Sequence, residues 1–187
     1  MNLQTKITIA APDFSIDYNS KLMMLGSCFA ENMGGKFSYY KFDVDVNPCG
    51  IIYNPLSVAN VLRLIMEGKP FGKDDLRKVG EKWVSLYHHG AFSSTDPEEC
   101  LRRINERLER AARELRSLDL LVITWGTAWV YKHVGENMVV SNCHKIPSQE
   151  FERSRLSVED IVKEYVELIG RLREINPGLR VLFTVSP

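Results

Sequence analysis

The chain has 187 residues, of which 44% are hydrophobic and 26% charged, values that suit one globular domain. Its 24 basic residues balance its 24 acidic ones, which argues against nucleic acid as a partner because no net field attracts a polyanion. No apolar stretch reaches the roughly 20 residues of a membrane span, and residues 1–11 lack the apolar core of a signal peptide. We therefore expect a cytoplasmic protein that does not bind membranes.

Short apolar runs alternate with helical patterns in the first half of the chain. Residues 21–25 predict a buried strand that ends at Gly26, and Ser27 offers a cap for a helix over 28–39. Residues 42–46 alternate between apolar and acidic types, which predicts a half-buried strand. Asn54 and Pro55 begin a second helix that ends at Gly68.

The second half continues this alternation. Residues 82–88 indicate a strand with imperfect alternation, and residues 95–117 predict an amphipathic helix with proline and two glutamates in its first turn. The continuous apolar run at 119–125 is typical of a strand covered on both faces. The remaining predictions are a hairpin at 131–140, a long amphipathic helix at 157–176 and a last, buried strand at 180–185.

Together these elements predict an α/β fold, a three-layer sandwich with a mostly parallel sheet, as one domain over residues 1–187. Ligands in such sheets bind beyond the carboxyl ends of the strands. Three motifs fall at such ends: Gly26-Ser27-Cys28, Asn47-Pro48-Cys49-Gly50 and Gly126-Thr127-Ala128-Trp129. We therefore expect the functional site where these motifs meet.

The first of these motifs is the best candidate for a nucleophile. A helix N-terminus favours an anionic nucleophile, and its free N–H groups can hold a developing oxyanion. The alternative is that Ser27 only caps the helix and Cys28 packs as a small hydrophobe. The four cysteines are scattered without metal-site spacing, so we expect reduced thiols and no metal or other cofactor.

Three segments carry a resemblance to a known family. Residues 25–32 (LGSCFAEN) resemble the signature of the GSCFA family, and residues 124–131 (TWGTAWVY) and Asn142-Cys143-His144-Lys145, followed by Pro147, resemble two further segments of that family. The resemblance extends over nearly the whole chain. GSCFA proteins are in turn similar to the SGNH/GDSL hydrolases, which implies a flavodoxin-like sheet and a small-molecule or carbohydrate substrate with an acyl ester.

The resemblance implies a role for each motif. Cys28 lies at the position of the nucleophile, although a shift by one residue makes Ser27 the nucleophile; we favour Cys28. Gly50 matches the glycine that donates its N–H to the oxyanion, or it is a plain loop glycine. Gly126-Thr127-Ala128 matches the Gly-x-Asn block, with alanine in place of asparagine. Thr127, Asn142 or a backbone group would then have to replace that donor.

The general base is the part of the resemblance for which this sequence has no matching motif. SGNH hydrolases carry Asp-x-x-His beyond the last strand, and no such segment precedes Pro187, so we interpret the chain as an N-terminal portion that dimerises or needs the missing segment. His144 is the best replacement within the chain. We expect His133 on the surface of the hairpin, and either His88 or His89 in the cleft.

The leading hypothesis is an SGNH-like acyl or ester hydrolase. A second hypothesis is a ligand-binding domain that has lost turnover, which Ala128 favours. A third is a thiol-based redox protein that uses Cys28 with Cys49 or Cys143 as the resolving cysteine.

Overall fold

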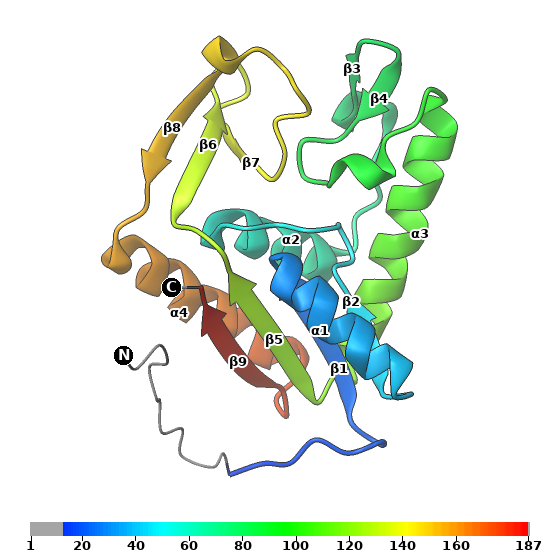
Figure 1. The fold of residues 1–187 in the computed structure, drawn as a ribbon, viewed down its shortest axis with the longest axis vertical. Helices are drawn as coiled ribbons and strands as arrows, with labels where there is room; N and C mark the ends of the chain where they lie inside the picture. The colour runs from blue at the N-terminus through cyan, green and yellow to red at the C-terminus, as the bar shows by residue number, and fades with distance from the viewer. Residues whose placement is uncertain (1–12, 187) are drawn as a thin grey trace, which may run out of the picture.

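A computed structural model describes residues 13–186 and shows an α/β fold built on a four-stranded parallel sheet (Figure 1). The strands are β1 (Lys21–Gly26), β2 (Asp43–Val46), β5 (Leu120–Trp125) and β9 (Arg180–Val185), in the order β2-β1-β5-β9. Every neighbouring pair is parallel. The predicted parallel sheet is therefore confirmed.

Four α-helices accompany the sheet: α1 (Cys28–Tyr39), α2 (Pro55–Glu67), α3 (Pro97–Leu115) and α4 (Val158–Ile175). Each begins after a polar residue whose side chain accepts a hydrogen bond from the first turn, as helix starts require: Ser27, Asn54, Asp96 and Ser157. Within the described residues, none of these helices combines the length and the apolar character that crossing a bilayer requires.

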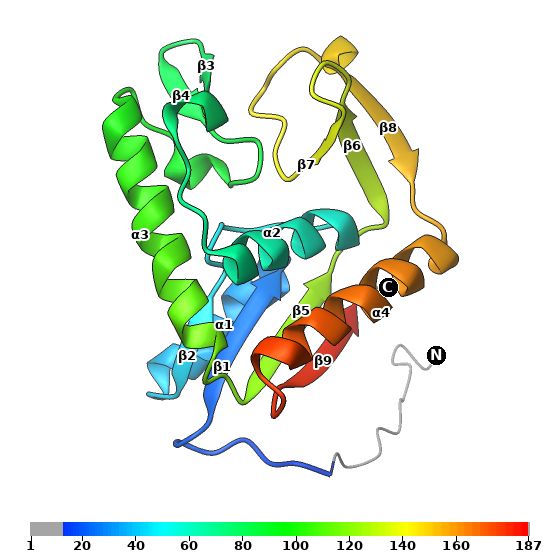
Figure 2. The same cartoon turned by 180° about the vertical axis from the view of Figure 1, so that it is seen from behind.

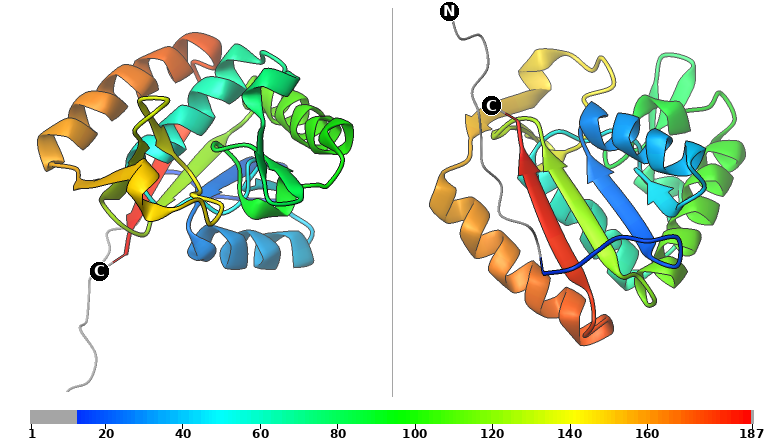
Figure 3. Two further views of the ribbon diagram at one scale, coloured as in Figure 1. Left: turned by 90° about the horizontal axis from the view of Figure 1, so that it is seen from above. Right: turned by 60° about the horizontal axis from the view of Figure 1, so that its bottom comes forward.

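The two faces of the sheet are covered by different helices. Leu22, Met24 and Val122 form one apolar cluster with Ala30 of α1. Side chains of the opposite face join the larger core with α2, α3 and α4, because successive residues of a strand point to opposite faces. Figure 2 shows α2, α3 and α4 on that rear face, and Figure 3 shows the strands side by side between the helices.

Two small antiparallel sheets lie beyond the carboxyl ends of the parallel strands (Figure 1). One pairs β3 (Arg77–Val79) with β4 (Lys82–Val84). The other has the order β7-β6-β8 and contains β6 (Trp129–His133), β7 (Met138–Val140) and β8 (Phe151–Arg155). Three short 3-10 helices, η1 (Lys73–Asp75), η2 (Gly90–Phe92) and η3 (Ser148–Glu150), connect these elements.

The small sheets differ most from the predictions. The strand expected at 82–88 ends at Val84. β3 and β8 were not predicted because their sequences, RKV and FERSR, are largely polar, and β8 is also largely exposed. The hairpin is confirmed as β6 and β7. The expectation that His133 lies on the surface is wrong: it is buried, with Nε2 2.8 Å from Nη1 of Arg77.

Candidate functional site

The turns after β1 and β5 lie side by side at the carboxyl edge of the sheet. From β1 the chain continues to β2 on one side, while β5 and β9 lie on the other, so the strand order reverses between β1 and β5. Ligands bind at such a reversal in open α/β sheets. The Ser27 N–H donates to Thr124 Oγ1 over 2.9 Å, and a Cβ placed on Gly126 would lie 3.4 Å from Ser27 Cβ.

Ser27 and Cys28 have different surroundings in this turn. Ser27 is only 3% exposed; its Oγ accepts from the Phe29 N–H at 3.3 Å and lies 3.1 Å from Thr124 Oγ1. Cys28 is the first residue of α1 and is exposed. The solvent-accessible nucleophilic group of the turn is therefore the Cys28 thiol.

Asn47 holds the turn in place. Its Oδ1 accepts from the Gly26 N–H at 2.9 Å, and its Nδ2 donates to Glu31 Oε2 at 2.8 Å. Gly26 has φ +128°, and a Cβ there would lie 2.0 Å from Thr124 O, so only glycine fits between the two strand ends. Asn47 thus joins the ends of β1 and β2 to the first turn of α1.

The backbone N–H groups expected to stabilise an oxyanion already have acceptors. Gly50 donates to Asn47 O at 2.8 Å, and Gly126 and Thr127 donate to Tyr53 O at 2.8 and 3.2 Å. Two side-chain donors remain. The Thr127 hydroxyl accepts from the Trp129 N–H at 3.1 Å and keeps its proton for another acceptor, and Asn142 uses Oδ1 for the His144 N–H at 2.8 Å, which leaves its amide NH₂.

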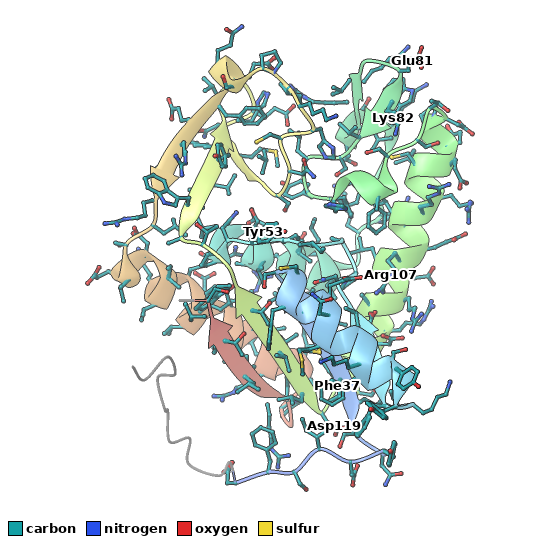
Figure 4. All side chains as sticks on the ribbon, in the orientation of Figure 1. Phe37, Tyr53, Glu81, Lys82, Arg107 and Asp119 are labelled. Atoms are coloured by element: carbon teal, nitrogen blue, oxygen red, sulfur yellow. The ribbon has the colours of Figure 1, made fainter. Side chains whose placement is uncertain are left out.

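A cavity of about 360 Å³ contains both of these side chains. We call it the aromatic cavity, and its lining consists of Ile51, Tyr53, Asn54, His89, Thr127, Trp129, Tyr131, Val140, Ser141, Asn142 and Cys143. Tyr53 lies where the parallel sheet meets the small sheets (Figure 4). A Cβ on Gly126 would lie 3.0 Å from Tyr53 Cδ1, so Gly126 separates the Tyr53 ring from Ser27 and connects the cavity to the start of α1.

Gly50 also borders this cavity, through His89. It has φ +82°, and a Cβ there would lie 2.3 Å from His89 Cβ. The His89 N–H donates to Cys49 O at 2.9 Å, which fixes the loop after β2 against the loop after β4. The expectation that His88 or His89 lines the cleft is met by His89.

His144 faces a neighbouring cavity of about 450 Å³ with Val79, Lys82 and Asn142. Its Nε2 lies 2.8 Å from Ser85 O, so Nε2 carries the proton and Nδ1 is left as a proton acceptor. Burial lowers the pKa of His144, which favours the neutral ring. Asn142 lines both cavities and is the side chain that connects them.

The other thiols are less available than Cys28. Burial raises the pKa of Cys49 to about 12 and also raises the pKa of Cys100 and of Cys143. Among residues 13–186, no group of three or more His, Cys, Asp or Glu side chains is arranged to hold a metal ion.

Sequence reasoning named Trp129 and Tyr131 only as parts of motifs and missed that both rings line the aromatic cavity. Trp129 and Tyr131 alternate on one face of β6, and Arg153 of β8 lies directly opposite Tyr131. The period-two spacing of the two aromatic residues was a readable signal. The position of Arg153 over the Trp129 ring follows from the pairing of β6 with β8, which the polar sequence of β8 does not reveal.

Comparison with known proteins identifies the family. No curated protein and no solved structure matches the chain. The family described as GSCFA family matches residues 21–187, which include the turn after β1, the turn after β5 and the loop that carries His144. The chain therefore belongs to the GSCFA family.

Proposed function

We propose that this GSCFA protein is an SGNH-like hydrolase that cleaves an acyl ester with Cys28 as the nucleophile. The observation that carries the proposal is the position of Cys28, which is exposed and is the first residue of α1, directly after Ser27. A Cβ on Gly126 would lie 3.4 Å from Ser27 Cβ and 3.0 Å from Cδ1 of Tyr53, a residue of the aromatic cavity. The sheet order supports the finer fold assignment, since β2-β1-β5-β9 corresponds to the first four strands of the flavodoxin-like order 2-1-3-4-5.

In the proposed reaction the Cys28 sulfur attacks the acyl carbonyl carbon. The C–O bond to the alcohol breaks, the alcohol leaves with a proton, and the acyl group remains as a thioester until water hydrolyses it. The Cys28 N–H, the Thr127 hydroxyl and the Asn142 amide are the proposed oxyanion donors, because the N–H groups of Gly50, Gly126 and Thr127 have other acceptors.

The proposed general base is His144 through Nδ1, because its Nε2–H is fixed on Ser85 O. His89 is the alternative, since it lines the aromatic cavity and contacts Gly50. Loss of turnover in His144→Gln but not in His89→Gln would assign the base to His144, and the reverse result would assign it to His89.

Turnover of a chromogenic acetyl ester tests the proposal. Cys28→Ala should abolish turnover and the acetyl-thioester that mass spectrometry detects on the peptide containing Cys28. Ser27→Ala should retain turnover, because Ser27 is buried and caps the helix. Cys143→Ala is the matched control for a thiol that is not the nucleophile. Undiminished turnover in Cys28→Ala would exclude Cys28 as the nucleophile.

A ligand-binding domain without turnover is the second candidate. Ala128 stands where SGNH hydrolases have asparagine, and three expected oxyanion donors are engaged elsewhere. This candidate predicts that an acetylated sugar perturbs the NMR signals of cavity residues while remaining intact in solution.

The thiol-based candidate receives its support from the exposure of Cys28 alone. Cys49 is 1% exposed, which leaves Cys143, a lining residue of the aromatic cavity, as the better resolving cysteine. A Cys28–Cys143 disulfide found by mass spectrometry after peroxide treatment would favour this candidate over the hydrolase.

A further inference from the structure

The aromatic cavity has a composition that distinguishes among substrate classes. Its lining, over the described part of the chain, presents three large aromatic rings (Tyr53, Trp129 and Tyr131) together with amide and hydroxyl groups, and includes no aspartate or glutamate. Tyr53 is 47% exposed, and Trp129 and Tyr131 are each 40% exposed, so part of each ring is accessible to a ligand. Its volume of about 360 Å³ lies within the usual range of about 300–1,000 Å³ for small-molecule sites.

Such a lining suits a sugar. The C–H groups of a pyranose ring pack on the negative face of an aromatic ring, while its hydroxyls need donors and acceptors at the edges. The Asn142 amide NH₂ and the Thr127 hydroxyl supply those polar groups. A purely apolar acyl chain would leave these amide and hydroxyl groups desolvated and unpaired, which is costly.

Arg153 adds a positive charge beside Trp129, a residue of the cavity lining. Trp129 and Tyr131 lie on the same face of the small sheet as Arg153, which pairs with Tyr131 across β6 and β8. The Arg153 guanidinium carbon lies 4.0 Å from the centre of the Trp129 ring and 5.9 Å from that of Tyr131. Within residues 13–186, no carboxylate pairs with it, so its N–H groups are available to an anion while the ring fixes their position.

We infer that the aromatic cavity binds an anionic sugar, with the pyranose ring against Tyr53, Trp129 and Tyr131 and its carboxylate or phosphate on Arg153. This inference rests on the proposed function, because it assumes that the sugar bound in the aromatic cavity carries the acyl ester that Cys28 attacks. A guanidinium recognises carboxylate and phosphate alike through paired hydrogen bonds, so the shared feature is the negative charge.

NMR titration of the full chain with three probes tests the inference: methyl β-glucuronide, glucose 6-phosphate and the neutral methyl β-glucoside. At least one anionic probe should bind about tenfold more tightly than the neutral one, because a hydrogen bond to a charged group is the stronger kind. Whichever anion binds more tightly identifies the carboxylate or the phosphate as the natural group. Arg153→Gln should remove the preference and leave the neutral probe unchanged, and Trp129→Ala should weaken all three.

Arg173→Gln is the matched control, because Arg173 is exposed in the last turn of α4, outside the cavity lining. Equal affinity for anionic and neutral probes, an unchanged preference in Arg153→Gln, or no binding by any probe would overturn the inference. The two proposals can be distinguished by these experiments. Ester turnover that survives in Cys28→Ala would refute Cys28 as the nucleophile and would leave the sugar-binding inference intact. Absence of sugar binding, with turnover that still depends on Cys28, would refute the sugar-binding inference alone.

Discussion

The four cysteines have different surroundings, and this difference can be measured residue by residue. Cys28 is exposed, Cys143 is half-buried, and Cys49 and Cys100 are buried. Alkylation requires both access and a thiolate, and burial raises the pKa of Cys49, Cys100 and Cys143. The start of α3 places Cys100 near a positive helix end as well, so access to solvent decides between Cys28 and Cys100.

We therefore predict that iodoacetamide modifies Cys28 first, Cys143 more slowly, and Cys49 and Cys100 only after unfolding. Peptide mapping after timed labelling of the native protein measures this order, and labelling in urea provides the control in which all four react. Labelling of Cys100 while Cys28 stays unmodified would mean that Cys28 is a packing residue, and Ser27 would become the better nucleophile.

At the scale of single elements, α1 contains adjacent glycines with opposite surroundings. A Cβ on Gly34 would lie 2.4 Å from Val46 Cγ2, whereas a Cβ on Gly35 would meet no atom within 4 Å. Gly34 thus lets α1 approach β2 closely, and that approach orients the helix whose first residue is Cys28. Gly35 has no such packing role and only lowers the stability of the helix.

We predict that Gly35→Ala raises the free energy of unfolding by up to about 1 kcal/mol, because alanine is the better helix former. Gly34→Ala should lower it by about 1–3 kcal/mol, because the methyl group forces α1 away from β2. Urea denaturation of the two variants and the parent protein measures both effects. The two changes are chemically identical and adjacent, so equal effects would contradict the packing argument.

The ion pair between Arg107 of α3 and Asp45 of β2 connects two other elements. Arg107 Nη1 lies 2.9 Å from Asp45 Oδ2, and Nη2 contacts Oδ1 and also donates to Val46 O at 3.0 Å. The Asp45 side chain is 3% exposed. Removing the arginine leaves a buried carboxylate without a partner, which is more costly than the loss of the pair itself.

We predict that Arg107→Ala destabilises the protein by about 3 kcal/mol, whereas Arg113→Ala, which breaks an exposed pair with Glu109 on the same helix, costs at most about 0.5 kcal/mol. Replacing both partners, as Asp45→Leu with Arg107→Met, should recover much of the loss. Thermal or urea unfolding provides the values, and equal losses for the two single variants would show that burial of Asp45 does not matter.

At the scale of the whole molecule, the parallel sheet could be predicted from the sequence and much of the site could not. The apolar runs at β1 and β5 are signals that burial on both faces imposes on a strand, and Ser27 and Pro97 mark helix starts directly. The expectation that the last strand is buried is wrong: β9 lies at the edge of the described sheet, and its residues are half-buried or exposed. Arg153, which lies over the Trp129 ring of the cavity lining, belongs instead to β8, whose exposed polar residues carry no strand pattern. The burial of His133 and the acceptor of the Gly126 N–H group depend on contacts between segments far apart in the chain.

The buried His88 predicts how the stability of the whole fold depends on pH. His88 is 1% exposed, packs between Phe71 and Phe92, and has Nδ1 2.9 Å from Ser85 Oγ. Burial, with a smaller contribution from His144, lowers the pKa of His88 from 6.5 to about 3. Between these two pH values the unfolded chain binds more protons than the folded one, so the free energy of unfolding rises with pH.

The stability that the neutral His88 ring contributes is therefore fully present above pH 6.5 and is lost as the pH falls toward 3. One proton gives a slope of up to about 1.4 kcal/mol per pH unit in this range. The free energy of unfolding, measured in urea at several values between pH 7.5 and pH 4, should show this slope in the parent protein. In His88→Phe, which keeps an aromatic ring between Phe71 and Phe92, the slope should be smaller by up to about 1.4 kcal/mol per pH unit. His89→Gln is the control, and an identical slope in His88→Phe and the parent would mean that another group determines the acid sensitivity.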